Sequence, residues 1–176
     1  MMEYYLMEQY AVTPVAPVLL EHEKYKYLLD RKNYESMPAV SIGYYEYGAG
    51  AEFPGVMRQP TFMVNRTVRD VFAMYDDSIR FKSIVLLPNV IEKSDEASEK
   101  YYIPDLKRYG CLDESADVLQ DGTVKRMVLN HKKMANDDVF QIDGLIHNKV
   151  VVSLRLAESI SRRSVYGIAF ERVIIV

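Results

Sequence analysis

Three histidines and one cysteine are the residues of this 176-residue chain best suited to metal or nucleophilic chemistry. His22, His131 and His147 are far apart, and none has a second His or Cys within the few residues that zinc ligands usually span. Cys111 could pair with a histidine only through the tertiary fold, and a lone cysteine commonly packs as a small apolar residue. The sequence therefore predicts no metal site, no cofactor and no catalytic residues.

Two further kinds of site are disfavoured by the sequence. No serine lies in a Gly-x-Ser-x-Gly elbow, and no glycine-rich stretch is followed by the Lys-Ser or Lys-Thr of a phosphate-binding loop. The net charge is -3 and the pI is about 5.7, which argues against a surface that binds nucleic acid. The alternative that stays open is a hydrolase or small-ligand site assembled from distant residues such as Asp76, Cys111 and His147.

Tyrosine is the unusual component of the composition, because the chain has 14 Tyr and no Trp. Nine of these tyrosines fall in the first fifty residues. Tyrosine combines an apolar ring with a polar hydroxyl, which favours it at surfaces that lose water on meeting a partner. Tyr44, Tyr45 and Tyr47 adjoin the glycine-rich residues 48–50 and are the candidate contact residues.

Acidic residues are concentrated in the middle of the chain, since residues 92–120 hold eight Asp and Glu against four Lys and Arg. We expect an acidic surface there for a basic partner, with carboxylates that imitate phosphates and speed association. The candidate contact residues are Asp95, Glu96, Glu99, Asp113 and Glu114.

Alternation of apolar residues predicts several short strands. Val40, Ile42 and Tyr44 share one face of a strand over residues 40–47. The apolar run at residues 81–87 suits a strand that is covered on both faces. Further strands are expected over residues 4–7, 101–103 and 168–176.

Turn and capping motifs complete the predicted fold. Asp-Gly pairs at residues 121–122 and 143–144 are typical of hairpins and predict antiparallel pairing around them. Thr67 and Asp70 resemble a capping box at the start of a helix, and Ser153 can cap a second helix. Residues 21–29 could form a third. The sequence thus predicts an α+β fold of mainly antiparallel strands with two or three short helices.

The chain is expected to have two parts and a cytoplasmic location. Residues 1–59 read as a Tyr-rich, irregular segment packed on an α+β domain over residues 60–176. The first ten residues carry Glu3 and Glu8 instead of the cationic start of a signal peptide. No apolar stretch approaches the roughly 20 residues of a membrane-spanning helix.

A series of short packing motifs runs through the second part of the chain. They are Phe-Met-Val at 62–64, Val-Arg-Asp-Val-Phe at 68–72, Phe-Lys-Ser-Ile-Val-Leu-Leu at 81–87, Tyr-Tyr-Ile-Pro at 101–104, Val-Val-Val-Ser at 150–153, Leu-Ala-Glu-Ser-Ile at 156–160 and Tyr-Gly-Ile-Ala-Phe-Glu at 166–171. Over residues 60–176, this pattern resembles a family of bacterial polymorphic-toxin immunity proteins, formerly classed as a domain of unknown function.

The resemblance implies a non-enzymatic antidote that binds and neutralises a cognate toxin in bacterial competition. It transfers no catalytic or binding residues, and it does not extend to the Tyr-rich residues 1–59. A structural module of a larger secreted apparatus is a further alternative, and the sequence makes no prediction of oligomeric state.

Overall fold

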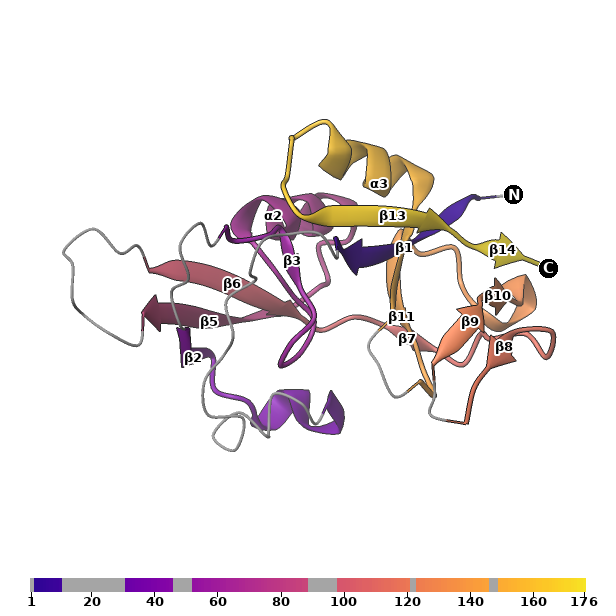
Figure 1. Ribbon diagram of the computed structural model, residues 1–176, viewed down its shortest axis with the longest axis horizontal. Coiled ribbons are helices and arrows are strands. Elements are labelled where there is room, and N and C mark those ends of the chain that lie inside the picture. The colour runs from indigo at the N-terminus through magenta and orange to yellow at the C-terminus, as the bar shows by residue number, and fades with distance from the viewer. Residues whose placement is uncertain (1, 11–30, 46–51, 89–97, 121–122, 146–148) are drawn as a thin grey trace.

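The computed structural model describes residues 2–10, 31–45, 52–88, 98–120, 123–145 and 149–176. These residues form two five-stranded sheets, two smaller pairs of strands and two short α-helices (Figure 1). The prediction of an α+β fold with mainly antiparallel strands is therefore confirmed. The helix predicted over residues 21–29 lies outside the described residues.

Sheet A has the strand order β13-β1-β12-β11-β7. All neighbours pair antiparallel except β11 and β7, which are parallel. The N-terminal strand β1 lies inside the sheet, with Leu6 opposite Val151 of β12 and Glu171 of β13. The strands are β13 (Ile168–Arg172), β1 (Tyr4–Gln9), β12 (Val150–Ser153), β11 (Val139–Ile142) and β7 (Arg108–Tyr109).

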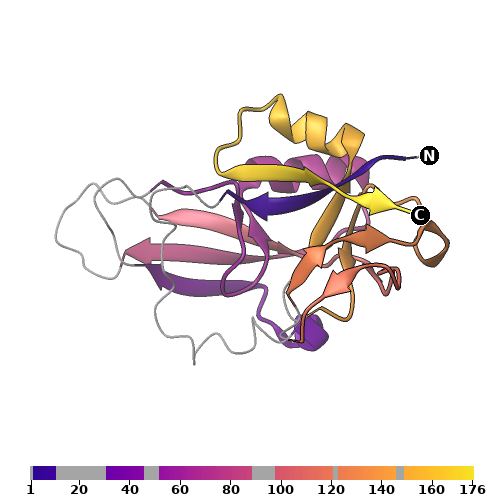
Figure 2. The ribbon, with the colours of Figure 1, turned by 45° about the vertical axis from the view of Figure 1, so that its right-hand side comes forward.

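Sheet B has the strand order β2-β5-β6-β4-β3. Its first pair, β2 with β5, is parallel, and the other pairs are antiparallel. Figure 2 shows β2, β5 and β6 side by side as the three long strands of this sheet. The strands are β2 (Val40–Tyr45), β5 (Phe81–Pro88), β6 (Glu99–Pro104), β4 (Met63–Val64) and β3 (Val56–Met57).

Antiparallel strand pairs occur on either side of both predicted Asp-Gly turns. An antiparallel pair, β8 with β9, flanks the Asp-Gly pair at 121–122, although those two residues lie outside the described part of the chain. Strands β11 and β12 pair antiparallel around the second Asp-Gly, where Gly144 has a φ of 83°. The remaining elements are β8 (Asp117–Val118), β9 (Val124–Arg126), β10 (Val128–Leu129), β14 (Ile174–Ile175), α2 (Arg66–Tyr75), α3 (Leu154–Ser161) and the 3-10 helices η2 (Arg31–Ser36) and η3 (His131–Lys133).

Both α-helices begin at a capping side chain. Ser153 Oγ accepts a hydrogen bond from the Leu156 amide at 3.3 Å, which confirms the predicted cap of α3. The predicted cap of α2 is wrong by half a turn, since Asn65 Oδ1 accepts from the Val68 amide at 3.0 Å and Thr67 is already helical. No helix among the described residues is long and apolar enough to cross a membrane.

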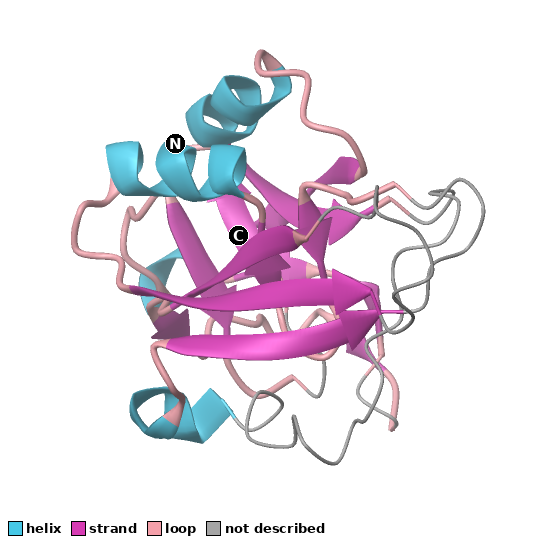
Figure 3. Ribbon diagram, turned by 90° about the vertical axis from the view of Figure 1, so that its left-hand side faces the viewer, coloured by secondary structure: helices cyan, strands magenta, loops and turns pink. Residues whose placement is uncertain are grey.

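Three apolar clusters hold these elements together. One face of sheet A, with Met7, Val150 and Val152, packs on α2 and α3, which lie next to each other on one side of the strands (Figure 3). The opposite face of sheet A packs on the segment that contains Cys111 and Leu129. A separate cluster lies against sheet B and includes residues from η2, β2, β5 and β6.

The first 59 residues belong to both sheets. They contribute β1 to sheet A and both β2 and β3 to sheet B. The predicted boundary between residues 1–59 and 60–176 therefore does not coincide with a boundary between packing units, because backbone hydrogen bonds join the two parts along three strands.

Gly55 lies where two segments approach closely. Its amide donates to the Tyr166 carbonyl at 2.7 Å, and its carbonyl accepts from the Asn65 amide at 2.9 Å. A Cβ atom at this position would lie 2.2 Å from Val165 Cγ1 and 2.8 Å from Ile168 Cδ1. The backbone can approach this far only because residue 55 has no side chain.

We expect Gly55→Ala to lower the free energy of unfolding by about 1–3 kcal/mol, the usual cost of overpacking. Urea denaturation followed by circular dichroism measures this difference. The matched control is Gly110→Ala, where an added Cβ meets nothing within 4 Å, and its stability should stay within about 0.5 kcal/mol of the parent. Equal effects of the two substitutions would contradict the steric argument.

Candidate functional site

The structure separates the three tyrosines that the sequence grouped as contact residues. Tyr44 is 38% exposed, whereas Tyr45 is fully buried with its ring edge-on to Phe53 at a centroid distance of 5.1 Å. Adjacent residues of a strand project to opposite faces, so the two cannot contact the same partner surface. Tyr45 is a core residue, and Tyr47 lies outside the described residues.

Glu99 does not share a surface with Tyr44. It pairs with Leu86 across β5 and β6 and therefore projects to the face that carries the buried Tyr101. Burial raises the pKa of Tyr101, and the Glu99 carboxylate raises it further. Tyr44 projects to the opposite face of sheet B, so Tyr44 and Glu99, two of the predicted contact residues, do not face the same partner surface.

Asp113 and Glu114 do not belong to sheet B, because they lie on the segment that connects β7 of sheet A with β8. Asp113 Oδ1 accepts from the amide and the hydroxyl of Ser115 at 3.0 and 2.8 Å, and Asn130 donates to its other oxygen at 3.1 Å. These hydrogen bonds hold the pKa of Asp113 below its usual value. Its carboxylate shapes a turn, and Glu114 beside it is exposed. The predicted Asp95 and Glu96 lie outside the described residues.

Of the three residues of the hydrolase hypothesis, the structure describes Asp76 and Cys111, which belong to different parts of the fold. Cys111 is fully buried in the cluster behind sheet A, and burial raises its pKa to about 11, so the unreactive thiol dominates at neutral pH. Asp76 follows α2 and accepts from the Ser78 amide at 3.0 Å. His147 lies outside the described residues, and those that are described contain no group of three His, Cys, Asp or Glu placed to hold a metal ion.

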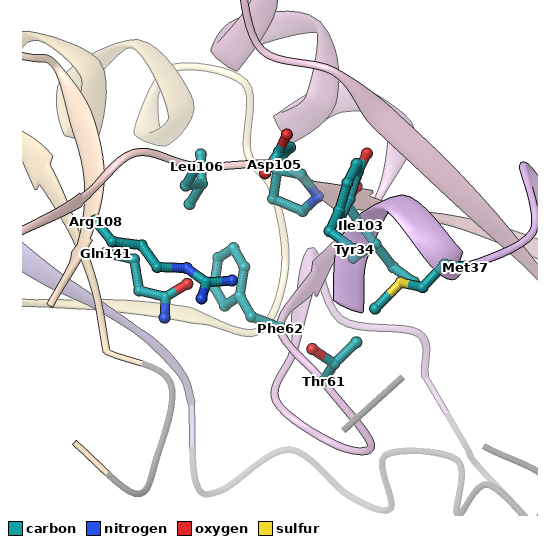
Figure 4. Close-up of a pocket in the computed structure, with 10 residues that line it drawn as sticks. Tyr34, Met37, Thr61, Phe62, Ile103, Asp105, Leu106, Arg108 and Gln141 are labelled. Atoms are coloured by element: carbon teal, nitrogen blue, oxygen red, sulfur yellow. The ribbon is translucent and has the colours of Figure 1, made fainter. Parts of the chain in front are cut away.

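A small cavity lies where the two sheets meet (Figure 4). Tyr34 and Met37 border it beside sheet B, and Arg108 and Gln141 of sheet A border it opposite, with Phe62 between them. Its volume of about 20 Å³ has room for a single water molecule. The cavity is therefore too small for a substrate.

A larger pocket of about 310 Å³ lies between β9 and sheet A. Its lining includes Glu8, which binds Arg58 at 2.8 Å and also forms an ion pair with Lys149. Arg172, also in the lining, binds Glu3 at 2.9 Å. Glu8, Lys149 and Arg172 of the lining are thus already paired with other charged residues of the protein.

An exposed apolar surface lies on β2. Val40 and Ile42 are 56% and 52% exposed and project to the same face as Tyr44, which confirms the alternation predicted for this strand. The parallel register places Val85 beside Ile42 and Leu87 beside Tyr44. We call these five residues, Val40, Ile42, Tyr44, Val85 and Leu87, the β2 face.

The β2 face is exposed because α2 covers only the other end of the same side of sheet B. Helix α2 packs on β4 and β6, and Val64 and Phe72 are buried there. Val85 and Leu87 are only half-buried, so the prediction that residues 81–87 are covered on both faces is wrong at this end of β5. An uninterrupted apolar run does not show which of its residues are exposed, so the sequence does not reveal that Val85 and Leu87 belong to the β2 face.

The chain was compared with known proteins. No protein-family model matches it, and no curated protein matches it either. The resemblance of residues 60–176 to immunity proteins therefore stays a prediction from the sequence.

Proposed function

We propose that this protein is a non-enzymatic immunity protein that binds and neutralises a cognate bacterial toxin in the cytoplasm. The resemblance over residues 60–176 supports the class, and the β2 face supports the mode of action. Neutralisation by binding requires a surface that excludes water from a partner, and exposed neighbouring apolar residues provide it.

The observation that carries the proposal is the continuity of the β2 face. Val40, Ile42 and Tyr44 form one exposed row, and Val85 and Leu87 of the next strand extend it by a second row. Single exposed apolar residues are ordinary on protein surfaces, whereas neighbouring ones on two strands mark a site of association. A toxin covered at or near its active site by this face would lose access to its substrate.

The experiment uses the product of the gene adjacent to the one that encodes this protein. We expect the two proteins to co-purify when expressed together, and this protein to restore growth to cells that express its neighbour. Absence of a complex, together with failure to restore growth, would overturn the proposed function.

Val40→Ser/Ile42→Thr tests whether the β2 face makes the contact. Removing the apolar groups should raise the dissociation constant of the complex at least about tenfold, which corresponds to about 1.4 kcal/mol. Calorimetric titration measures the affinity. The matched control is Val118→Ser/Ile174→Thr, because Val118 and Ile174 are similarly exposed at 42% and 46% on other strands. An equal loss in both double variants would show that the β2 face is not the contact.

A further inference from the structure

Two cationic side chains approach the ring of Tyr102 on β6. The guanidinium of Arg69, from α2, is 4.7 Å from the ring centroid, and Lys100 Nζ is 5.4 Å from it. Lys100 and Tyr102 are two residues apart on one strand and therefore project from the same face of sheet B. We call Arg69, Lys100 and Tyr102 the cationic edge.

Positive charge at the cationic edge is only partly neutralised. Arg69 binds Asp70 at 2.8 Å, but that same carboxylate is also 4.0 Å from Arg66. Lys100 is exposed and has no carboxylate within salt-bridge distance among the residues that the structure describes. Two arginines thus share one carboxylate and Lys100 has none within reach in the described part of the chain, so the surplus charge is positive.

Arg69 also carries an unused donor. Its Nε is buried and has no hydrogen-bond acceptor among the described residues. A buried donor without an acceptor costs free energy, and a cationic donor costs more than a neutral one. A carboxylate supplied beside Arg69 would let the guanidinium turn and recover this hydrogen bond.

The cationic edge is continuous with the β2 face. The register places Ile42 beside Val85 and Val85 beside Lys100, which forms one cross-strand row from β2 to β6. A second row runs from Val40 through Ser83 to Tyr102. Apolar and cationic side chains therefore belong to one surface, with the cations on the side toward α2.

We propose that an acidic, amphipathic segment of the partner protein binds here, with its apolar side chains on the β2 face and a carboxylate at Arg69 and Lys100. This inference rests on the proposed function and names the chemistry of the partner. The partner segment proposed here is acidic, whereas the acidic run at residues 92–120 led us to expect a basic partner. Tyr44 is the one aromatic ring of the β2 face, and the other four side chains are aliphatic and cannot stack on bases. This composition favours a protein segment over nucleic acid.

The test compares Arg69→Gln/Lys100→Gln with the parent for binding to the product of the adjacent gene. We expect the double variant to bind at least about tenfold more weakly and to show a smaller loss of affinity as salt rises, because screening acts on the removed charges. Lys100→Arg should keep the affinity. The matched control, Arg126→Gln/Lys132→Gln, removes one Arg and one Lys from β9 and η3 and should leave the affinity unchanged.

The outcomes distinguish the proposed acidic segment from the proposed immunity function. Unaltered affinity and salt dependence in Arg69→Gln/Lys100→Gln, with normal binding by the parent, would overturn the acidic segment and leave the proposed function standing. Absence of binding by the parent overturns the proposed function itself. Lys100→Gln alone guards against misfolding of α2, since Lys100 is exposed and lies on β6. Tight binding of a single-stranded RNA oligonucleotide that is lost in the same variants would reassign the surface to nucleic acid.

Discussion

Tyr45→Ala is expected to lower the free energy of unfolding by about 3–5 kcal/mol, the cost of removing a large aromatic side chain from a core. The ring of Tyr45 is fully buried among residues that include Met57, Met63 and Ile84. Its edge-on contact with Phe53 is lost as well. Urea denaturation followed by circular dichroism measures the loss, because a chain without Trp offers no indole fluorescence.

The neighbouring Tyr44→Ala is the matched control for this prediction. Tyr44 belongs to the β2 face, so its replacement should change the unfolding free energy by no more than about 0.5 kcal/mol and should weaken partner binding several-fold. Similar losses of stability in both variants would contradict the assignment of Tyr45 to the core and of Tyr44 to the surface.

Asp138→Ala is expected to lower the free energy of unfolding by about 2–4 kcal/mol. The carboxylate of Asp138 is buried and accepts from Ser153 Oγ at 2.5 Å and from Arg155 Nε at 2.6 Å. Its carbonyl accepts from the Ser153 amide at 2.8 Å. Ser153 in turn caps α3, so one aspartate fixes both the end of β12 and the start of the helix.

Two variants separate the parts of this network. Asp138→Asn keeps an acceptor for Ser153 and should lose less stability than Asp138→Ala. Arg155→Gln should have a small effect, because the Arg155 side chain is 62% exposed and solvent weakens its ion pair. If Arg155→Gln is as destabilising as Asp138→Ala, the surface ion pair and not the buried cap holds α3 in place. Thermal unfolding followed at a helix wavelength provides the comparison.

Local features of the fold could be predicted from the sequence where one motif determines one element. The alternation of Val40, Ile42 and Tyr44 determines which side chains of β2 share a face. Ser153 marks the start of α3 because its hydroxyl satisfies a helical amide. The predicted start of α2 is wrong because Thr67 and Asp70 imitate a capping box while Asn65 provides the cap. Two nearby polar residues can compete for this role, and the sequence alone does not rank them.

The candidate site depended on pairings that span the chain, which no local pattern reveals. Tyr44 and Tyr45 are neighbours in sequence, yet the period of a strand places them on opposite faces. Lys100 lies beside Val85 because β5 and β6 pair antiparallel in one register. The apolar run at residues 81–87 suggests a buried strand, but it carries no information on how far α2 extends over the sheet, and α2 leaves Val85 partly exposed. Which residues share a surface is therefore fixed by register and by the length of the covering helix.

The position of β1 within sheet A has a consequence for the newly made chain. Both neighbours of β1 are synthesised late, since β12 begins about 140 residues after β1 ends. At roughly 5–20 residues per second, β1 waits about 7–30 s on the ribosome before its first partner strand is made. During this interval Leu6 and Met7 have no sheet to cover them. We therefore expect β1 to be exposed to chaperones while the rest of the chain is made, and pairing of sheet A to be a late step in folding.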